Sequence, residues 1–206
     1  MSDQEQPQIY LITPPEFELS QFSEQLAAVL DAHEVACLRL ALSTHDEDRI
    51  SRAADACREI AHTRDVAVVL QTHIALAERL GLDGVHLTDG ARSVRKARKA
   101  LGADAIVGAY CAQSRHEGMS AGEAGADYVS FGPAGSSALG DGAQAESELF
   151  QWWSEMIEIP VVAEGALDAA RVADLAGMTD FFGIGDEIWS QDDPAGALAQ
   201  LVRAIR

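Results

Sequence analysis

Three side chains combine residue types that could perform acid–base or anion chemistry, namely Arg39, His86 and Glu164. Each lies at or near the end of a short apolar run. A carboxylate in such a place is a candidate general base or metal ligand, and histidine titrates near neutral pH. A buried arginine needs an anion, which is either a ligand or a carboxylate of the protein itself. We predict that these three residues carry the chemistry, with Tyr110 as a further hydrogen-bond donor. The partner of Arg39 can be either a ligand anion or a carboxylate of the protein, and both alternatives stay open.

A second set of residues is suited to binding a substrate rather than reacting with it. Glycine lets the backbone approach an anion closely, and glycines after the late apolar runs suit a phosphate-binding loop. A long stretch over residues 132–145 is rich in Gly, Ser and Ala. The predicted substrate-binding residues are Gln71, Gly132, Ser136, Ser137, Gly165, Gly183 and Gly185.

Carboxylates stand beside these predicted phosphate loops. Glu164 precedes one of the glycines, and Asp186 and Glu187 follow another. Two like charges about 4 Å apart repel by roughly 4 kcal/mol at an effective dielectric near 20. A repulsion of this size weakens the binding of an anion by about a thousandfold. We therefore expect phosphate to bind poorly and Glu164 to be the cause, unless Glu164 pairs with Arg39 instead.

The elements that must position these residues are short apolar runs that alternate with amphipathic stretches. Such alternation indicates α/β architecture with a parallel sheet covered on both faces. Eight units favour a single (β/α)8 TIM barrel over residues 1–206, with an open sheet as the main alternative. The apolar runs cover residues 9–13, 35–41, 66–70, 84–87, 105–109, 127–131, 160–163 and 180–184.

A parallel barrel would gather the candidate residues at one mouth, because chemistry in this fold sits at the carboxyl ends of the strands. Leu38 and Leu40 flank Arg39, so packing of the two leucines outwards points Arg39 into the barrel. Several helix-to-strand joins contain Gly followed by Asp, and a glycine there suits a left-handed helix end.

Composition limits the partners. Thirty-three acidic residues oppose fifteen basic ones, for a net charge of -18, and this field repels nucleic acid and anionic membranes. Cys37, Cys57 and Cys111 form no disulfide or zinc pattern. We find no secretory signal and no apolar run of membrane-spanning length. We predict a cytoplasmic protein with a small-molecule substrate, and assembly into a homo-oligomer remains open.

Several segments resemble one known family in order along nearly the whole chain. The segment 81–87 ends in Gly-Val-His-Leu, the segment 123–133 reads Glu-Ala-Gly-Ala-Asp-Tyr-Val-Ser-Phe-Gly-Pro, and 159–163 reads Ile-Pro-Val-Val-Ala. These segments resemble thiamine-phosphate synthases. The resemblance implies an enzyme of thiamine biosynthesis that joins a pyrimidine pyrophosphate to a thiazole phosphate with the help of Mg²⁺. A thiazole tautomerase-like enzyme and a non-catalytic ligand-binding barrel are the alternatives.

The chain departs from the family pattern at positions that bind charge. The family has Gln-x-Arg-x-Lys where this chain has Cys37-Leu-Arg-Leu-Ala41, and Asn-Asp where it has Gln71-Thr72. The loop after the sixth strand has no basic residue over 135–142. Mg²⁺ prefers oxygen ligands with one or two carboxylates. Asp89 is the remaining candidate ligand, so the sequence predicts weak magnesium binding.

Overall fold

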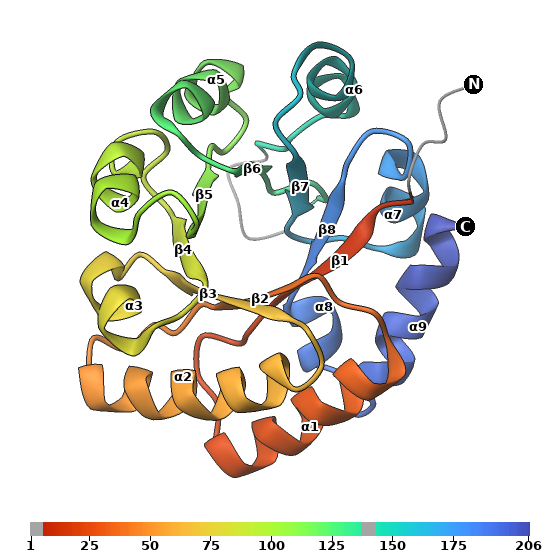
Figure 1. The fold of residues 1–206 in the computed structure, drawn as a ribbon. Helices are drawn as coiled ribbons and strands as arrows, with labels where there is room; N and C mark the ends of the chain where they lie inside the picture. Colours follow the sequence, from red (N-terminus) through yellow and green to blue (C-terminus); the bar gives the residue numbers. More distant parts are fainter. Residues whose placement is uncertain (1–5, 137–142) are drawn as a thin grey trace.

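The computed structural model describes residues 6–136 and 143–206. Eight strands alternate with helices and close into one parallel barrel (Figure 1), which confirms the (β/α)8 prediction. The strands are β1 (Gln8–Ile12), β2 (Cys37–Leu40), β3 (Ala67–Gln71), β4 (Gly84–Leu87), β5 (Ile106–Tyr110), β6 (Tyr128–Phe131), β7 (Val161–Glu164) and β8 (Phe181–Ile184).

Helices surround the barrel and follow the strands. They are α1 (Leu19–Ala32), α2 (Glu47–His62), α3 (Ile74–Leu80), α4 (Val94–Leu101), α5 (Arg115–Ala124), α6 (Ser147–Met156), α7 (Ala169–Leu175), α8 (Asp186–Trp189) and α9 (Pro194–Ile205). The alternation does not predict α8, a four-residue helix directly after β8, because one turn is too short to show a helical period.

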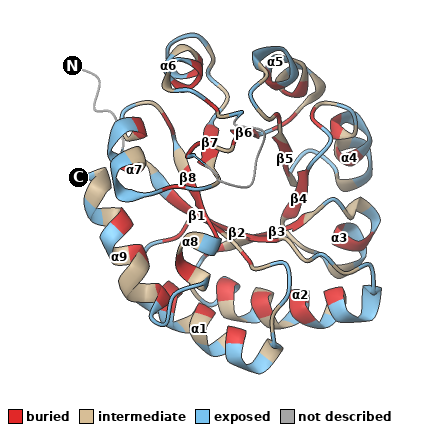
Figure 2. Ribbon diagram, turned by 180° about the vertical axis from the view of Figure 1, so that it is seen from behind, coloured by how far each residue is buried: buried red, intermediate tan, exposed pale blue. Residues whose placement is uncertain are grey.

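Each strand pairs in parallel with the next, and β1 closes the barrel by pairing with both β2 and β8. Leu11 is the residue that aligns with Leu38 on one side and with Ile184 on the other. The strands are buried on both faces, as Figure 2 shows by their red colour, while the helices are exposed on their outer sides. This two-sided burial explains why the strands read as nearly continuous apolar runs.

The apolar residues form two layers. The larger cluster lies between the strands and the helices and includes Leu11, Leu38 and Leu40. The smaller cluster fills the barrel itself, with Tyr10, Cys37, Val69, Tyr128 and Val162 as its buried members. Leu38 and Leu40 thus pack outwards, and Arg39 between them faces the interior, as the alternation predicts.

The Gly-x-Asp joins have two structural roles. Gly81 and Gly125 end α3 and α5 in the left-handed conformation, as predicted. The aspartates that follow add contacts that the sequence does not reveal. Asp83 and Asp127 each stand just before a strand, and so does Asp180, which follows Gly177 by three residues instead of two. The carboxylate of each accepts a hydrogen bond from a backbone N–H near the start of the preceding strand, at 2.7–2.8 Å.

Candidate active site

The structure brings Arg39, His86 and Glu164 together inside the carboxyl-terminal mouth of the barrel. They come from β2, β4 and β7. Nη1 of Arg39 donates to Nε2 of His86 at 2.6 Å and to Oε2 of Glu164 at 2.9 Å. The Arg39 side chain is 6% exposed and that of Glu164 is 12% exposed. Of the two partners predicted for Arg39, the structure supplies the internal carboxylate.

A chain of hydrogen bonds continues from this cluster into the barrel interior. Nδ1 of His86 lies 2.9 Å from the Tyr128 hydroxyl, which lies 2.6 Å from the Tyr10 hydroxyl. A guanidinium can only donate, so Nε2 of His86 accepts and its Nδ1 carries the proton. His86 then donates to the oxygen of Tyr128, whose hydroxyl shares a hydrogen bond with that of Tyr10. Neither tyrosine was among the predicted site residues, although both occupy inward positions, Tyr10 on β1 and Tyr128 on β6.

Burial fixes the charge states in this cluster. Desolvation lowers the pKa of His86 well below its usual value, and the charge of Arg39 lowers it further, so the ring is neutral. Desolvation is the largest influence on the pKa of Arg39 and lowers it, but the charge of Glu164, its hydrogen bond and the two nearby tyrosines together raise the pKa by more, so the net shift is upward. The cluster therefore combines an ion pair with a neutral imidazole.

Two buried polar atoms near this cluster lack a hydrogen-bond partner among the described residues, namely Nε of Arg39 and Oγ of Ser130. Ser130 follows Tyr128 by two residues on β6 and faces the interior as Tyr128 does. Buried polar groups in proteins are nearly always satisfied. Unused donors at a barrel mouth are therefore suited to a polar ligand.

The remaining mouth residues shape the site. The Tyr110 hydroxyl donates to the Gly132 carbonyl at 2.8 Å, which ties β5 to the loop after β6. A side chain at Gly132 would meet the carbonyl of Glu164 at 2.5 Å, so glycine lets these two segments lie close. Gln71 is half-buried and aligns with His86 across β3 and β4. Ser136 is exposed, and Ser137 lies outside the described residues.

The loops after β7 and β8 form a small cup of backbone donors. Gly165 has a φ of 91°, which glycine adopts readily. The backbone N–H groups of Leu167 and Gly185 point at one carboxylate, that of Glu187, with distances of 3.1 Å to Oε1 and 2.7 Å to Oε2. We call these two N–H groups the anion cup. The carboxylate in it is Glu187, whereas Glu164, which the sequence analysis favoured, is turned to Arg39.

Strained backbone is concentrated around the mouth. Thr72, Ala112 and Ala166 have φ values of 73°, 49° and 53°, and they follow β3, β5 and β7. Non-glycine residues rarely adopt positive φ, least of all a β-branched residue such as Thr72. Such strain often marks functional sites, because only the surrounding structure can hold it.

Arg171 of α7 holds both ends of the loop after β6. Its side chain donates to the carbonyl of Ala134 at 2.6 Å and to the carbonyl of Ala145 at 2.8 Å. It also contacts Ser147 and Asp174, each at 2.6 Å. One side chain thus fixes where the long loop leaves and rejoins the barrel.

The donor set predicted for Mg²⁺ does not form a cluster. Asp89 is exposed, and one of its carboxylate oxygens accepts from the Ser93 hydroxyl at 2.6 Å. In the described part of the chain, no three His, Cys, Asp or Glu side chains could hold a metal ion together. The described residues therefore do not fit a strong magnesium site.

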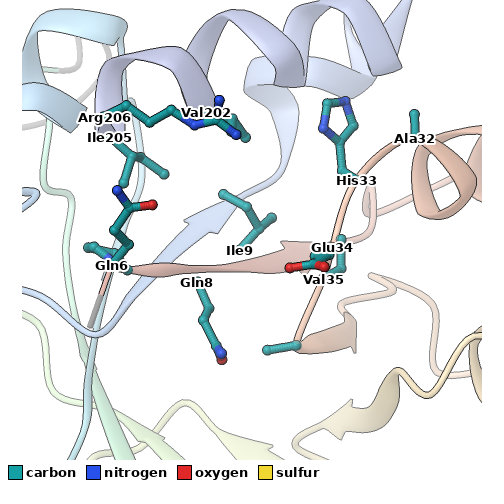
Figure 3. Close-up of a pocket in the computed structure, with 12 residues that line it drawn as sticks. Gln6, Gln8, Ile9, Ala32, His33, Glu34, Val35, Val202, Ile205 and Arg206 are labelled. Carbon is teal, nitrogen blue, oxygen red and sulfur yellow. The ribbon is translucent and has the colours of Figure 1, made fainter.

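A pocket of about 570 Å³ lies at the opposite end of the barrel, where β1 begins. Its walls include the segment after α1 and the end of α9. Figure 3 shows Gln8 and Ile9 on opposite sides of β1, with His33 above the strand. Because barrel chemistry sits at the other end of the strands, we place the candidate site at the mouth that holds Arg39 and Glu164.

A closed (β/α)8 barrel with a polar, strained mouth belongs to the class of barrels that bind and convert small molecules at the carboxyl ends of their strands. Within this class, the chain belongs to the thiamine monophosphate synthase family, whose family model matches residues 9–181.

Two of its relatives match over almost their whole length. A protein from Rhodospirillum centenum named thiamine-phosphate synthase is 42% identical over 204 residues, covering 96% of this chain and 97% of its own. One of the same name from Erythrobacter litoralis is 39% identical over 207 residues, covering 97% of this chain and 96% of its own.

Solved structures confirm the fold. A thiamine phosphate pyrophosphorylase from Pyrococcus furiosus superposes with a TM-score of 0.83, covering 96% of this chain and 95% of its own, at 19% identity. An orotidine 5'-phosphate decarboxylase from Pyrococcus horikoshii gives a TM-score of 0.70, covering 96% of this chain and 99% of its own, at 14% identity. At such identities the likeness concerns the fold. Within the described residues, no helix has the length and apolar character needed to cross a membrane.

Proposed function

We propose that this chain is a thiamine-phosphate synthase, which joins a pyrimidine pyrophosphate to a thiazole phosphate in thiamine biosynthesis. The observation that carries the proposal is the 42% identity over 96% of the chain to a protein with that name. In this reaction the bond from the pyrimidine methylene carbon to pyrophosphate breaks, and its electron pair leaves with pyrophosphate. The lone pair of the thiazole nitrogen then forms the new carbon–nitrogen bond.

The charges at the mouth suit both halves of this reaction. The guanidinium of Arg39 would stabilise the negative charge that develops on the departing pyrophosphate, because it is a fixed positive charge at the mouth. The carboxylate of Glu164 would favour the pyrimidine cation in the same site. Tyr110 and Gln71 are half-buried at the rim, where they could orient the rings by hydrogen bonds.

His86 is assigned a positioning role. The ring is 1% exposed, and Arg39 and Tyr128 use both its nitrogens. A neutral imidazole that accepts from Nη1 leaves the guanidinium charge undiminished and fixes its plane. The sequence predicts a catalytic histidine, whereas these contacts favour a role for His86 that acts through Arg39.

Magnesium does not enter this proposal as a bound group. The family resemblance implies Mg²⁺, but the Asp89 carboxylate is already bonded to Ser93, and the described residues around it bring no three His, Cys, Asp or Glu side chains together. We therefore assign no step to the metal. We further propose that the chain is a single domain over residues 1–206 and that it acts in the cytoplasm.

The test is an assay with the two family substrates and Mg²⁺, in which thiamine phosphate and pyrophosphate are both measured. The expected result is equal amounts of the two products. Arg39→Gln should lower kcat by at least about a hundredfold, since it removes a charge that acts in the transition state. Arg203→Gln, on the outer face of α9, is the matched control. Product formation that is unchanged by Arg39→Gln would contradict the assigned role, and no product from the wild type would contradict the function.

A further inference from the structure

The anion cup already contains a negative group of the protein. In (β/α)8 barrels, the loops after the seventh and eighth strands often bind phosphate through backbone N–H groups. Here the two oxygens of the Glu187 carboxylate each accept from one N–H group of the cup. This is the bidentate contact that a phosphate would make with the same donors.

A local helix cap does not account for this contact. The bond from Gly185 is local, because this residue precedes Glu187 by two positions. The bond from Leu167 is not local, because it comes from the loop after β7, twenty residues earlier in the chain. Glu187 therefore joins the two loops across the cup instead of capping its own helix alone.

No cationic side chain competes for this carboxylate in the described part of the chain. The ion pairs there involve other acidic residues, including the pair of Glu164 with Arg39. Glu187 is half-buried, so its side chain has room to rotate towards solvent if another anion takes the donors.

We propose that Glu187 is a specificity-determining residue, which competes with the phosphate of a substrate for the N–H groups of Leu167 and Gly185. A phosphate-bearing substrate binds after the Glu187 side chain leaves the anion cup. The identity of that substrate rests on the proposed function, whereas the competition itself does not. Glu164 has no part in this competition, because Arg39 holds it.

Inorganic phosphate tests the competition directly, by titration calorimetry on the full chain. Glu187→Ala should bind phosphate at least about tenfold more tightly than the wild type, because it removes both the occupant and its charge. Asp186→Asn is the matched control, since it removes a neighbouring charge but leaves the occupant. The phosphate affinity of Asp186→Asn should differ from that of the wild type by less than about threefold, because solvent and salt screen an exposed charge.

Two results would overturn the proposal. One is equal phosphate affinity in Glu187→Ala and the wild type, and the other is an equal gain in Asp186→Asn, which would indicate general electrostatics. If Glu187→Ala fails to fold, Glu187→Gln replaces it, because the amide oxygen can still accept one bond. Glu187→Gln should bind phosphate more tightly than the wild type, and equal affinity would again overturn the proposal.

The Michaelis constants provide a second readout. Glu187→Ala should lower KM for the thiazole phosphate and leave KM for the thiazole alcohol unchanged. An equal effect on both substrates would count against competition for the phosphate. If neither substrate reacts with any variant, the proposed function fails, and the phosphate titration still decides the role of Glu187.

Discussion

Arg39 and Glu164 face each other across the barrel mouth, with 2.9 Å between Nη1 of the arginine and Oε2 of the glutamate. They belong to β2 and β7, which are not neighbours in the sheet. The pair therefore links two distant parts of the barrel wall. It also makes the mouth more nearly neutral than either residue alone.

Loss of one member of this pair should be costly. Glu164→Ile leaves Arg39 buried without its counter-charge, so the free energy of unfolding should fall by about 3–5 kcal/mol. Urea denaturation is the measurement. Glu164→Gln keeps an oxygen acceptor for Nη1 of Arg39, so its free energy of unfolding should fall by less than that of Glu164→Ile. Unchanged stability of Glu164→Ile would show that the pair contributes nothing to the fold.

The buried neutral His86 should make stability depend on pH. Its pKa is lowered in the folded state, so the unfolded chain binds a proton more readily. Stability from this residue is present above about pH 6.5 and falls by about 1.4 kcal/mol for each pH unit below it. Denaturation between pH 8 and pH 5 should show this slope in the wild type, and His86→Gln should lack it. Equal slopes of stability against pH in the wild type and in His86→Gln would mean that His86 is protonated in the folded protein.

Magnesium binding should respond to the residue after β3. Thr72 lies next to Thr88, with 3.4 Å between their hydroxyl oxygens, and Asp89 follows Thr88. Thr72→Asp restores the family carboxylate there, and Asp tolerates positive φ better than Thr does. In calorimetric titrations without substrate, we expect Mg²⁺ to bind the wild type more weakly than micromolar and Thr72→Asp about tenfold more tightly. Thr72→Asn, the control for backbone relief, should match the wild type.

The contacts of Arg171 should depend on its planar guanidinium. Arg171→Lys keeps the charge but cannot reach the carbonyls of Ala134 and Ala145 together, so unfolding should become easier by about 1–3 kcal/mol. Arg203→Lys, at an exposed position, should change stability by less than about 0.5 kcal/mol. A small effect of Arg171→Lys in urea denaturation would show that the loop ends need no such anchor.

The barrel and its mouth are predictable from the sequence for local reasons. Short apolar runs separated by amphipathic stretches define parallel strands, and the position of Arg39 between two leucines fixes its direction. The predicted strand over residues 35–41 is shorter in the structure, Cys37–Leu40. Strand ends depend on which neighbour supplies hydrogen bonds, and one chain segment does not contain that information.

Which side chains contact one another at the barrel mouth is harder to predict from the sequence. Sequence places Glu164, Asp186 and Glu187 near the phosphate loops, but which carboxylate enters the anion cup depends on the direction of each side chain. Arg39 draws Glu164 away, and α8 turns Glu187 inwards. Tyr10 and Tyr128 have a large sequence separation, so their contact becomes visible when the barrel is closed.

The pairing of β1 with β8 has a consequence for the order of events during synthesis. The ribosome makes β1 first and β8 last, yet Leu11 needs Ile184 as its neighbour. At about 5–20 residues per second, the first strand waits roughly ten seconds or longer for its partner. During that time one edge of β1 is unpaired, and a ribosome-associated chaperone is the kind of factor that would shield it. Stalled chains that end before residue 181 should therefore aggregate more readily than the released protein.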